Sequence, residues 1–203
     1  MNTTALQWLK HSLIVASVAL LAACAEESPV GVKESTASRR TTDATALAST
    51  VAASADQAGP DLGTCTDLYV HRSAFLSHVY ARGVQIYRWS GSAWIFVGPS
   101  AVLSADPNGL TTVGIHYVGP TWESASGSKV VAAVRKRCTP NPNAIQWLLL
   151  AAVSNEGPGV FGQAGLIQRV NTVGGMAPSA PGSFVGQEKR EPYTAEYYFY
   201  RAP

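Results

Sequence analysis

The segment HYVGPTWE contains the two residues best suited to acid–base chemistry. His116 and Glu123 stand at its two ends, and Trp122 precedes the glutamate. An imidazole and a carboxylate held close together can act as general base and general acid toward a substrate. In the alternative interpretation, the two side chains bond to each other or to turn backbone, and Gly119-Pro120 shapes a bend. His116 and Glu123 are therefore the candidate catalytic residues of a hydrolase or isomerase, with a structural role as the alternative.

Aromatic and polar side chains spread over several segments predict a binding site. A pocket with aromatic walls and a few polar groups suits a carbohydrate or a small amphipathic molecule. The alternative is that aromatic side chains on strands form core or cross-strand pairs. The candidate binding residues are Gln85, Tyr87, His116, Trp122, Glu123, Arg169 and Tyr198. Further side chains that could line the same pocket are Trp89, Trp147, Glu196 and Tyr200.

Other chemistries lack a complete pattern. His71 and His78 could join His116 at a metal only if the fold brought all three together. The sequence GPGVFG at 157–162 matches a dinucleotide-binding glycine pattern, but Pro158 removes an amide donor and no acidic residue follows about 20 residues later. The GxSxG, HExxH and P-loop motifs are absent from the sequence. We therefore expect no metal and no cofactor, and a glycine-rich hairpin at 157–162.

The first residues predict export and a lipid anchor. Residues 1–23 contain a weakly basic start and the apolar run SLIVASVAL, which is too short to span a bilayer as a helix. Leu21-Ala22-Ala23 before Cys24 resembles the bacterial lipobox, in which the cysteine thiol takes the lipid; an ordinary secretory signal is the alternative. Ala25 follows where an aspartate would indicate retention at the inner membrane. We expect a lipid anchor on Cys24 in the bacterial cell envelope, at the outer membrane.

The residues after Cys24 predict a tether and then one domain. Residues 24–60 are rich in Ala, Ser and Thr and contain no aromatic residue, so they bury too little apolar surface to order themselves. We expect the folded domain at 61–203. Its two cysteines, Cys65 and Cys138, form an even number in an oxidising compartment and predict a disulfide, with two separate buried thiols as the alternative.

Composition and patterning predict the fold class of this domain. The chain has 203 residues, a charged fraction of 14% and a net charge of +2, which exclude a coiled coil, an acidic disordered chain and capture of nucleic acid by charge. Short alternating or apolar runs are separated by Gly and Pro turns, and amphipathic helices are absent from the pattern. We predict an all-β domain, a single antiparallel β-sandwich or flattened barrel of about eight or more strands. The expected strands are 84–89, 94–97, 101–104, 111–118, 129–137, 145–153, 166–172 and 193–200.

Ordered blocks along the domain carry a family resemblance. They are ARGVQIY at 81–87, GIHYVGPTWE at 114–123, WLLL at 147–150, IQRVNT at 167–172 and PYTAEYYFY at 192–200. In this order and spacing the chain resembles the family called domain of unknown function 3455, over about 75–200. The resemblance implies a secreted domain and brings no established activity.

Two departures from the family pattern follow from the resemblance. It implies a cysteine where Trp89 stands and another near Ser183, so their joint absence fits the loss of one disulfide. It also implies an aspartate where this chain has Ser126, and any chemistry of that carboxylate in relatives is missing here.

Together these observations favour a lipid-anchored envelope domain that binds a ligand or partner without catalysis. The expected partners are the membrane, through the lipid on Cys24, and a small-molecule or carbohydrate ligand, but no nucleic acid. The first alternative is a hydrolase or isomerase that uses His116 and Glu123. The second alternative is a structural protein of the envelope.

Overall fold

A computed structural model describes residues 59–202. The expected signal peptide, the lipidation site Cys24 and nearly all of the expected tether lie outside the described residues. No helix within 59–202 is long and apolar enough to cross a membrane.

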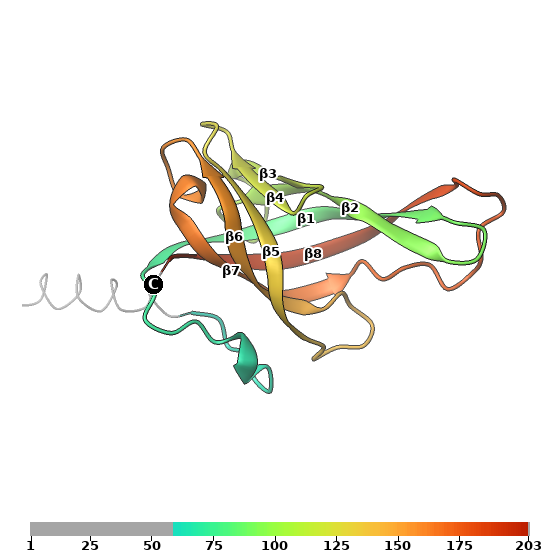
Figure 1. The fold of residues 1–203 in the computed structure, drawn as a ribbon, viewed down its shortest axis with the longest axis horizontal. Coiled ribbons are helices and arrows are strands. Elements are labelled where there is room, and N and C mark those ends of the chain that lie inside the picture. The colour runs from blue at the N-terminus through green and yellow to red at the C-terminus, as the bar shows by residue number, and fades with distance from the viewer. Residues whose placement is uncertain (1–58, 203) are drawn as a thin grey trace, which may run out of the picture. The chain divides into compact units, whose positions relative to one another are not determined.

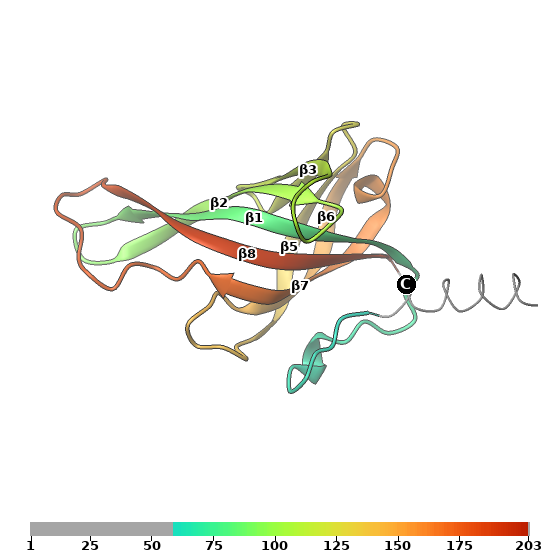
Figure 2. The same ribbon diagram turned by 180° about the vertical axis from the view of Figure 1, so that it is seen from behind.

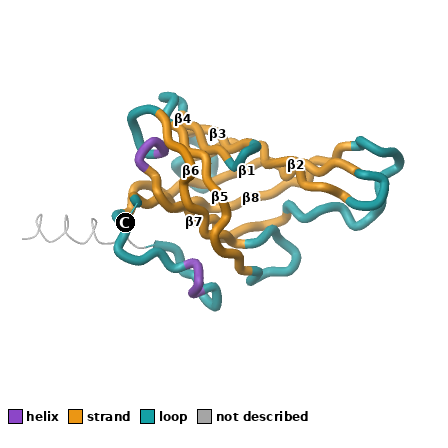
Figure 3. Tube along the Cα trace, viewed as in Figure 1, coloured by secondary structure: helices purple, strands orange, loops and turns teal. Residues whose placement is uncertain are grey.

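The domain is a closed barrel of eight strands, each antiparallel to its neighbours (Figures 1 and 2). Each strand pairs with the next along the chain, and the last returns to pair with the first. The helical elements of the described residues are two short 3-10 helices (Figure 3). The strands are β1 (Phe75–Trp89), β2 (Trp94–Ser104), β3 (Thr112–Tyr117), β4 (Thr121–Ser124), β5 (Lys129–Cys138), β6 (Trp147–Glu156), β7 (Ala164–Gly174) and β8 (Glu188–Arg201), with the turns η1 (Thr66–Leu68) and η2 (Phe161–Gln163). The all-β prediction is confirmed, and the sheet closes into a barrel through the pairing of β8 with β1.

Most strands differ from the prediction only in where they begin and end, and three differ in other ways or by more. β1 begins at Phe75, well before the expected 84, and β4 was not expected. β2 runs without a break through Gly98-Pro99, where the sequence indicated a turn between two strands. Pairing explains this difference, because β3 meets β2 only from Ser100 onward and Pro99 has β1 as its single partner. A proline without an N–H group is tolerated in a strand at such an edge position.

Alternation along the strands fills one end of the barrel interior with apolar side chains. On β8 the inward residues include Ala195 and Phe199, both buried, as the two-faced pattern of this segment predicted. Phe161 on η2 packs on Phe199 with ring centroids 4.7 Å apart and so closes this end. The Asn155 side-chain amide donates to the Phe161 carbonyl at 3.0 Å, which fixes η2 in place. We call this region the packed end; its members include Val79, Leu103, Val130, Phe161 and Phe199, and the same buried cluster continues to Trp122 and Tyr197.

A second apolar cluster lies on the outside of the barrel, under the segment that precedes β1. Leu62 and Leu68 pack there against Leu149 of β6 and Val170 of β7. The cysteines close this cluster, since Cys65 and Cys138 form a disulfide across 73 residues of sequence. The predicted bridge is therefore present, and it joins the segment before β1 to the end of β5.

The strands β1 and β2 extend past the barrel as a long hairpin arm, beside the start of β8 (Figure 1). Trp89 and Trp94 pair near its tip, with ring centroids 5.4 Å apart. A Cβ atom at Gly182 would lie 2.5 Å from Cγ of Trp89. The two positions where the family resemblance implies cysteines are therefore neighbours, and the Trp89 ring packs directly on the backbone at Gly182.

Candidate ligand-binding cavity

The other end of the barrel interior holds a cavity of about 550 Å³. This volume falls within the usual range of sites for small ligands, about 300–1,000 Å³. An eight-stranded barrel is just wide enough inside either to be filled by side chains or to hold one small ligand. We call this region the cavity end. Its apolar lining residues are Phe96, Pro99, Pro120, Val134, Pro142, Ala144, Ile145, Leu148, Leu150 and Met176, and its polar and aromatic ones include Gln85, Tyr87, His116, Trp122, Arg137, Arg169 and Tyr197.

The short hairpin of β3 and β4 leaves this end open. β4 pairs with β5 only over Lys129–Val131, and β3 pairs with β2 only from Ser100 onward. The facing stretches of β2 and β5 beyond these points therefore lack a neighbour on one side. Phe96 and Val134, which line the cavity, come from those two stretches. Phe96 is 51% exposed, so an apolar side chain marks the boundary between cavity and solvent.

Four buried polar side-chain atoms at the cavity end have no hydrogen-bond partner among the described residues. They are Nε2 of Gln85, Nε1 of Trp122 and the hydroxyl groups of Tyr193 and Tyr197. Gln85, Trp122 and Tyr197 line the cavity themselves and are 2%, 1% and 0% exposed. Burial raises the pKa of both Tyr193 and Tyr197, so both hydroxyl groups keep their protons at neutral pH. Burying an unpaired polar group costs about 1–3 kcal/mol, so each of these groups requires an explanation.

His116 lies in the wall of this cavity as a neutral ring. Its Nδ1 lies 2.8 Å from the Thr121 carbonyl oxygen and donates to it, which leaves Nε2 as an acceptor. The ring stacks on Trp122 with centroids 4.3 Å apart, and Tyr197 meets its edge at 5.2 Å. Burial lowers the pKa of His116 to about 3, so the imidazole is uncharged at neutral pH.

Arg169 supplies positive charge at the same end. Its Nε and Nη2 donate to the Gln146 carbonyl at 3.1 and 2.7 Å, which fixes the plane of the guanidinium group. No carboxylate lies within ion-pair distance of Arg169 in the described part of the chain, where the ion pairs involve other residues. Burial raises the pKa of Tyr197, and the positive charge of Arg169 opposes this effect to a smaller extent. The charge of Arg169 is therefore felt at the cavity wall.

Glu123 does not join His116, so the expected acid–base pair is wrong. In the β3–β4 hairpin, His116 pairs with Trp122, and Glu123 pairs with Ile115. Successive residues of a strand point to opposite faces of a sheet, so His116 faces inward and Glu123 outward. There the Glu123 carboxylate accepts a 2.6 Å hydrogen bond from the Tyr117 hydroxyl.

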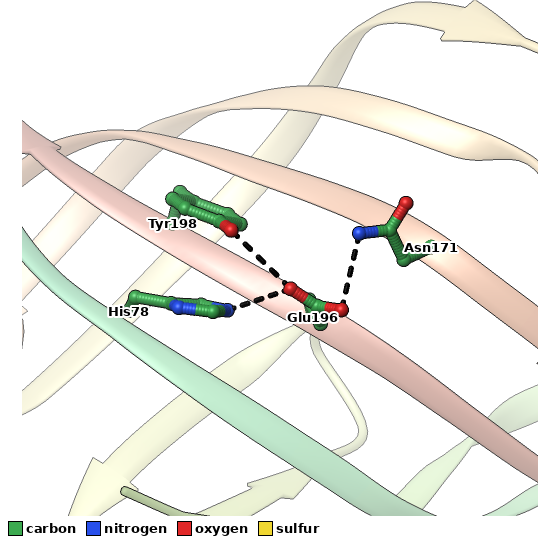
Figure 4. A network of polar contacts seen from close by, with 4 residues as sticks. All are labelled: His78, Asn171, Glu196 and Tyr198. Carbon is green, nitrogen blue, oxygen red and sulfur yellow. Dashed lines mark hydrogen bonds and ion pairs between the residues drawn. The ribbon is translucent and has the colours of Figure 1, made fainter. Parts of the chain in front are cut away.

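Tyr198 also lies outside the cavity, in a polar network on the outer face of the barrel (Figure 4). Glu196 is its centre, and it accepts from Nε2 of His78 at 2.8 Å, from Nδ2 of Asn171 at 3.1 Å and from the Tyr198 hydroxyl at 3.3 Å. Asn171 has a φ of 49° at a break in register between β7 and β8, which turns its amide toward Glu196. Burial lowers the pKa of His78, and Glu196 opposes this effect. Both oxygens of Glu196 are thus bonded, as in a structural network.

The remaining candidates for chemistry are also separated. His78 lies outside and His116 inside, and residues 59–202 contain no group of three His, Cys, Asp or Glu residues that could hold a metal ion. The glycines at 157–162 form the connection between the antiparallel strands β6 and β7, as the hairpin interpretation expected. Its Gly162 amide donates to the hydroxyl of Ser128 at 3.1 Å, so this loop closes the packed end.

Five of the seven candidate binding residues therefore line one cavity: Gln85, Tyr87, His116, Trp122 and Arg169. The prediction missed Tyr197, which lines the cavity, although the alternation along 193–200 placed it on the same face as Tyr193. Of the further aromatic candidates, Trp147 and Tyr200 lie outside: Trp147 packs on the outer apolar cluster, and Tyr200 donates to Gln168 of that face at 2.6 Å.

Comparison with known proteins identifies the family. Residues 71–201 match the family described as "Protein of unknown function (DUF3455)", so the chain belongs to this family. No curated protein and no solved structure matches the chain.

Proposed function

We propose that this member of the DUF3455 family binds a small, mainly apolar molecule in the cavity end of its barrel and releases it unchanged. One observation carries the proposal: a cavity of about 550 Å³ whose apolar wall is interrupted by buried polar atoms without a partner. Binding pockets of this size have the same composition, mostly apolar with a few polar groups that orient the ligand.

A purely structural role leaves the cavity end unexplained. Protein interiors are normally close-packed, and every buried polar group without a partner destabilises the fold. At the packed end of the same barrel, the interior is filled with apolar side chains, as expected where only stability is required. Sites retained at a cost in stability are typical of function.

Catalysis by His116 and Glu123 is disfavoured by their positions on opposite faces of the sheet. The rings that contact His116 belong to Trp122 and Tyr197, and burial raises the pKa of Tyr197. General acid catalysis requires a proton donor whose pKa lies near the working pH, and neither neighbour is such a donor at neutral pH. A binding function needs only the shape and the donors that are present.

We further propose that the domain is exported and held at the cell envelope by lipid on Cys24. The lipobox-like sequence supports this, and so does the Cys65–Cys138 disulfide, because such bridges persist in oxidising compartments. Metabolic labelling of bacteria with a radioactive fatty acid should mark the wild-type chain but not a Cys24→Ser variant. Equal labelling of the two chains would contradict the anchor.

Displacement of a neutral fluorescent probe tests the binding function. N-phenyl-1-naphthylamine should bind the full chain saturably at one site. Val134→Phe places a ring in the cavity and should weaken binding about tenfold or more, which corresponds to about 1.4 kcal/mol. Val153→Phe, the same change at an exposed position of β6, is the matched control and should leave binding unchanged. No saturable binding, or an equal loss in both variants, would contradict the proposal.

A further inference from the structure

We infer that the ligand of the cavity end carries a carboxylate on an apolar body, and that Arg169 with the unpartnered donors around it recognises this group. The inference rests on the proposed binding function and adds the chemical class of the ligand. It is argued from the hydrogen-bonding capacity, the charge and the apolar wall of the cavity.

The four buried polar atoms without a partner can all donate, and Nε2 of His116 is an acceptor beside them. Nε1 of Trp122 is a donor only, and Nε2 of Gln85 carries two protons. The hydroxyl group of Tyr197, which also lines the cavity, can donate one proton more. A ligand that satisfies such a set must accept several hydrogen bonds at once. An ionised carboxylate does so, because its two oxygens offer about four acceptor positions and no proton.

The charge of the lining points to the same group. Arg137 and Arg169 are its charged residues, and no aspartate or glutamate of residues 59–202 lines the cavity. The Gln146 carbonyl holds Nε and Nη2 of Arg169, so the guanidinium group is oriented before a ligand arrives. Arginine pairs with carboxylates through strong, charge-assisted hydrogen bonds, and this pairing is strongest where water is excluded.

The same observations disfavour other ligand classes. An ammonium group would meet two positive charges and a set of donors. A carbohydrate, one of the ligand classes that the sequence predicts, needs acceptors and donors in similar number across its surface. Most of the lining is instead aliphatic, proline or aromatic, as in Val134, Leu148 and Leu150. This wall suits an alkyl or aryl body behind a single polar head.

Ligands that differ only in their head group test the inference. Decanoate, decanol and decylamine are titrated at pH 7 into the full chain with bound N-phenyl-1-naphthylamine, the chain carrying Cys24→Ser. Decanoate should bind about tenfold more tightly than decanol, because a hydrogen bond to a charged group is stronger than one to a neutral group, and decylamine should bind most weakly. Equal affinities for decanoate and decanol would overturn the inference while leaving the binding function intact. Failure of the probe to bind at all would instead contradict the binding function.

Two variants assign the recognition to its residues. Arg169→Gln should abolish the preference for decanoate over decanol. Arg190→Gln removes an equal charge from an exposed position of β8 outside the cavity and should keep the preference. If Arg169→Gln does not fold, Trp122→Phe tests the same contact, because it keeps a ring but removes the indole donor. It should reduce the preference several-fold, and a preference that survives in the folded variants would overturn the inference.

Discussion

The two ends of the barrel interior are built from the same strands but from different side chains. At the packed end, Val79, Leu103 and Phe199 are almost completely buried and contact other apolar residues. At the cavity end, Gln85, Trp122 and Tyr197 are equally buried, yet each has a polar atom without a partner. Burial alone therefore does not distinguish core from site in this protein. Buried polar atoms without a hydrogen-bond partner are what distinguish the site from the core.

The difference follows from how each end is closed. At the packed end the connection between β6 and β7 folds over the interior and inserts Phe161. At the cavity end β3 and β4 have six and four residues, whereas β2 and β5 have eleven and ten, so part of the wall is missing. A short hairpin in an otherwise long-stranded barrel is thus sufficient to produce an open cavity beside a solid core.

The largest expected effect is the loss of a ring from the packed end. Phe199→Ala removes a fully buried side chain and should lower the free energy of unfolding by about 3–5 kcal/mol. Leu148→Ala at the cavity end should cost only about 2 kcal/mol, because its neighbours already border open space. Denaturant unfolding of both variants measures the difference. Equal losses would show that the two ends are packed alike.

Acid should destabilise the fold through His116. Its pKa is about 3 in the folded state and about 6.5 in the unfolded state, so the unfolded chain binds one more proton between these values. Stability is therefore complete above about pH 6.5 and falls by about 1.4 kcal/mol per pH unit as the pH drops toward 3.

Comparison with a His116→Gln variant isolates this contribution. Stability curves of both chains are measured from pH 7 to pH 4, and their slopes rather than their absolute values are compared. The variant should lack the histidine contribution to the slope. Parallel curves would contradict a buried, neutral His116.

Two tyrosines at the cavity end should respond in opposite directions to the loss of a hydroxyl group. Tyr197→Phe removes a hydroxyl without a partner and should raise the free energy of unfolding by about 1 kcal/mol. Tyr87→Phe removes a hydroxyl that donates to the Gly175 carbonyl at 2.8 Å and should lower it by about 1 kcal/mol. Thermal unfolding of the pair checks the signs. A loss of stability in Tyr197→Phe would show that its hydroxyl is satisfied in the free protein.

The smallest effect is expected from the polar network on the outer face. Glu196→Gln keeps the shape of the side chain but removes the charge that faces His78. Because both side chains are partly exposed, the loss should be about 0.2–1 kcal/mol, and probe binding in the cavity should not change. Thermal unfolding and probe titration of the same sample measure both quantities. Weakened probe binding would link this network to the site.

Much of the fold was predictable because the strands of this domain have local signatures. The alternation along 193–200 correctly separated the face of Tyr197 from the face of Tyr198, and the two cysteines of the domain predicted their own bridge. The sequence could not show which face of β8 lies inside the barrel, because both faces carry aromatic residues and an apolar cluster covers part of the outside. Tyr198 was therefore placed in the pocket in error.

The pairing of His116 with Glu123 failed for a related reason. Both residues lie beside a tight turn, but the register of the hairpin, which aligns His116 with Trp122, decides which side chains share a face. The same register made Trp122 the stacking partner of His116. Gly98-Pro99 was similarly misleading, because its place within β2 depends on where β3 stops pairing.

The indole signal of Trp122 tests the central claim most directly. In a ¹⁵N–¹H spectrum of the full chain carrying Cys24→Ser, each tryptophan contributes one Nε1–H signal, and the Trp122→Phe variant assigns the signal of interest. Addition of decanoate should move the Trp122 signal downfield, because its free N–H gains an acceptor, while decanol should move it less. The Trp94 signal should stay in place, since its Nε1 already donates to the Ala180 carbonyl at 2.8 Å. An unchanged Trp122 signal at saturating decanoate would contradict a carboxylate site in the cavity.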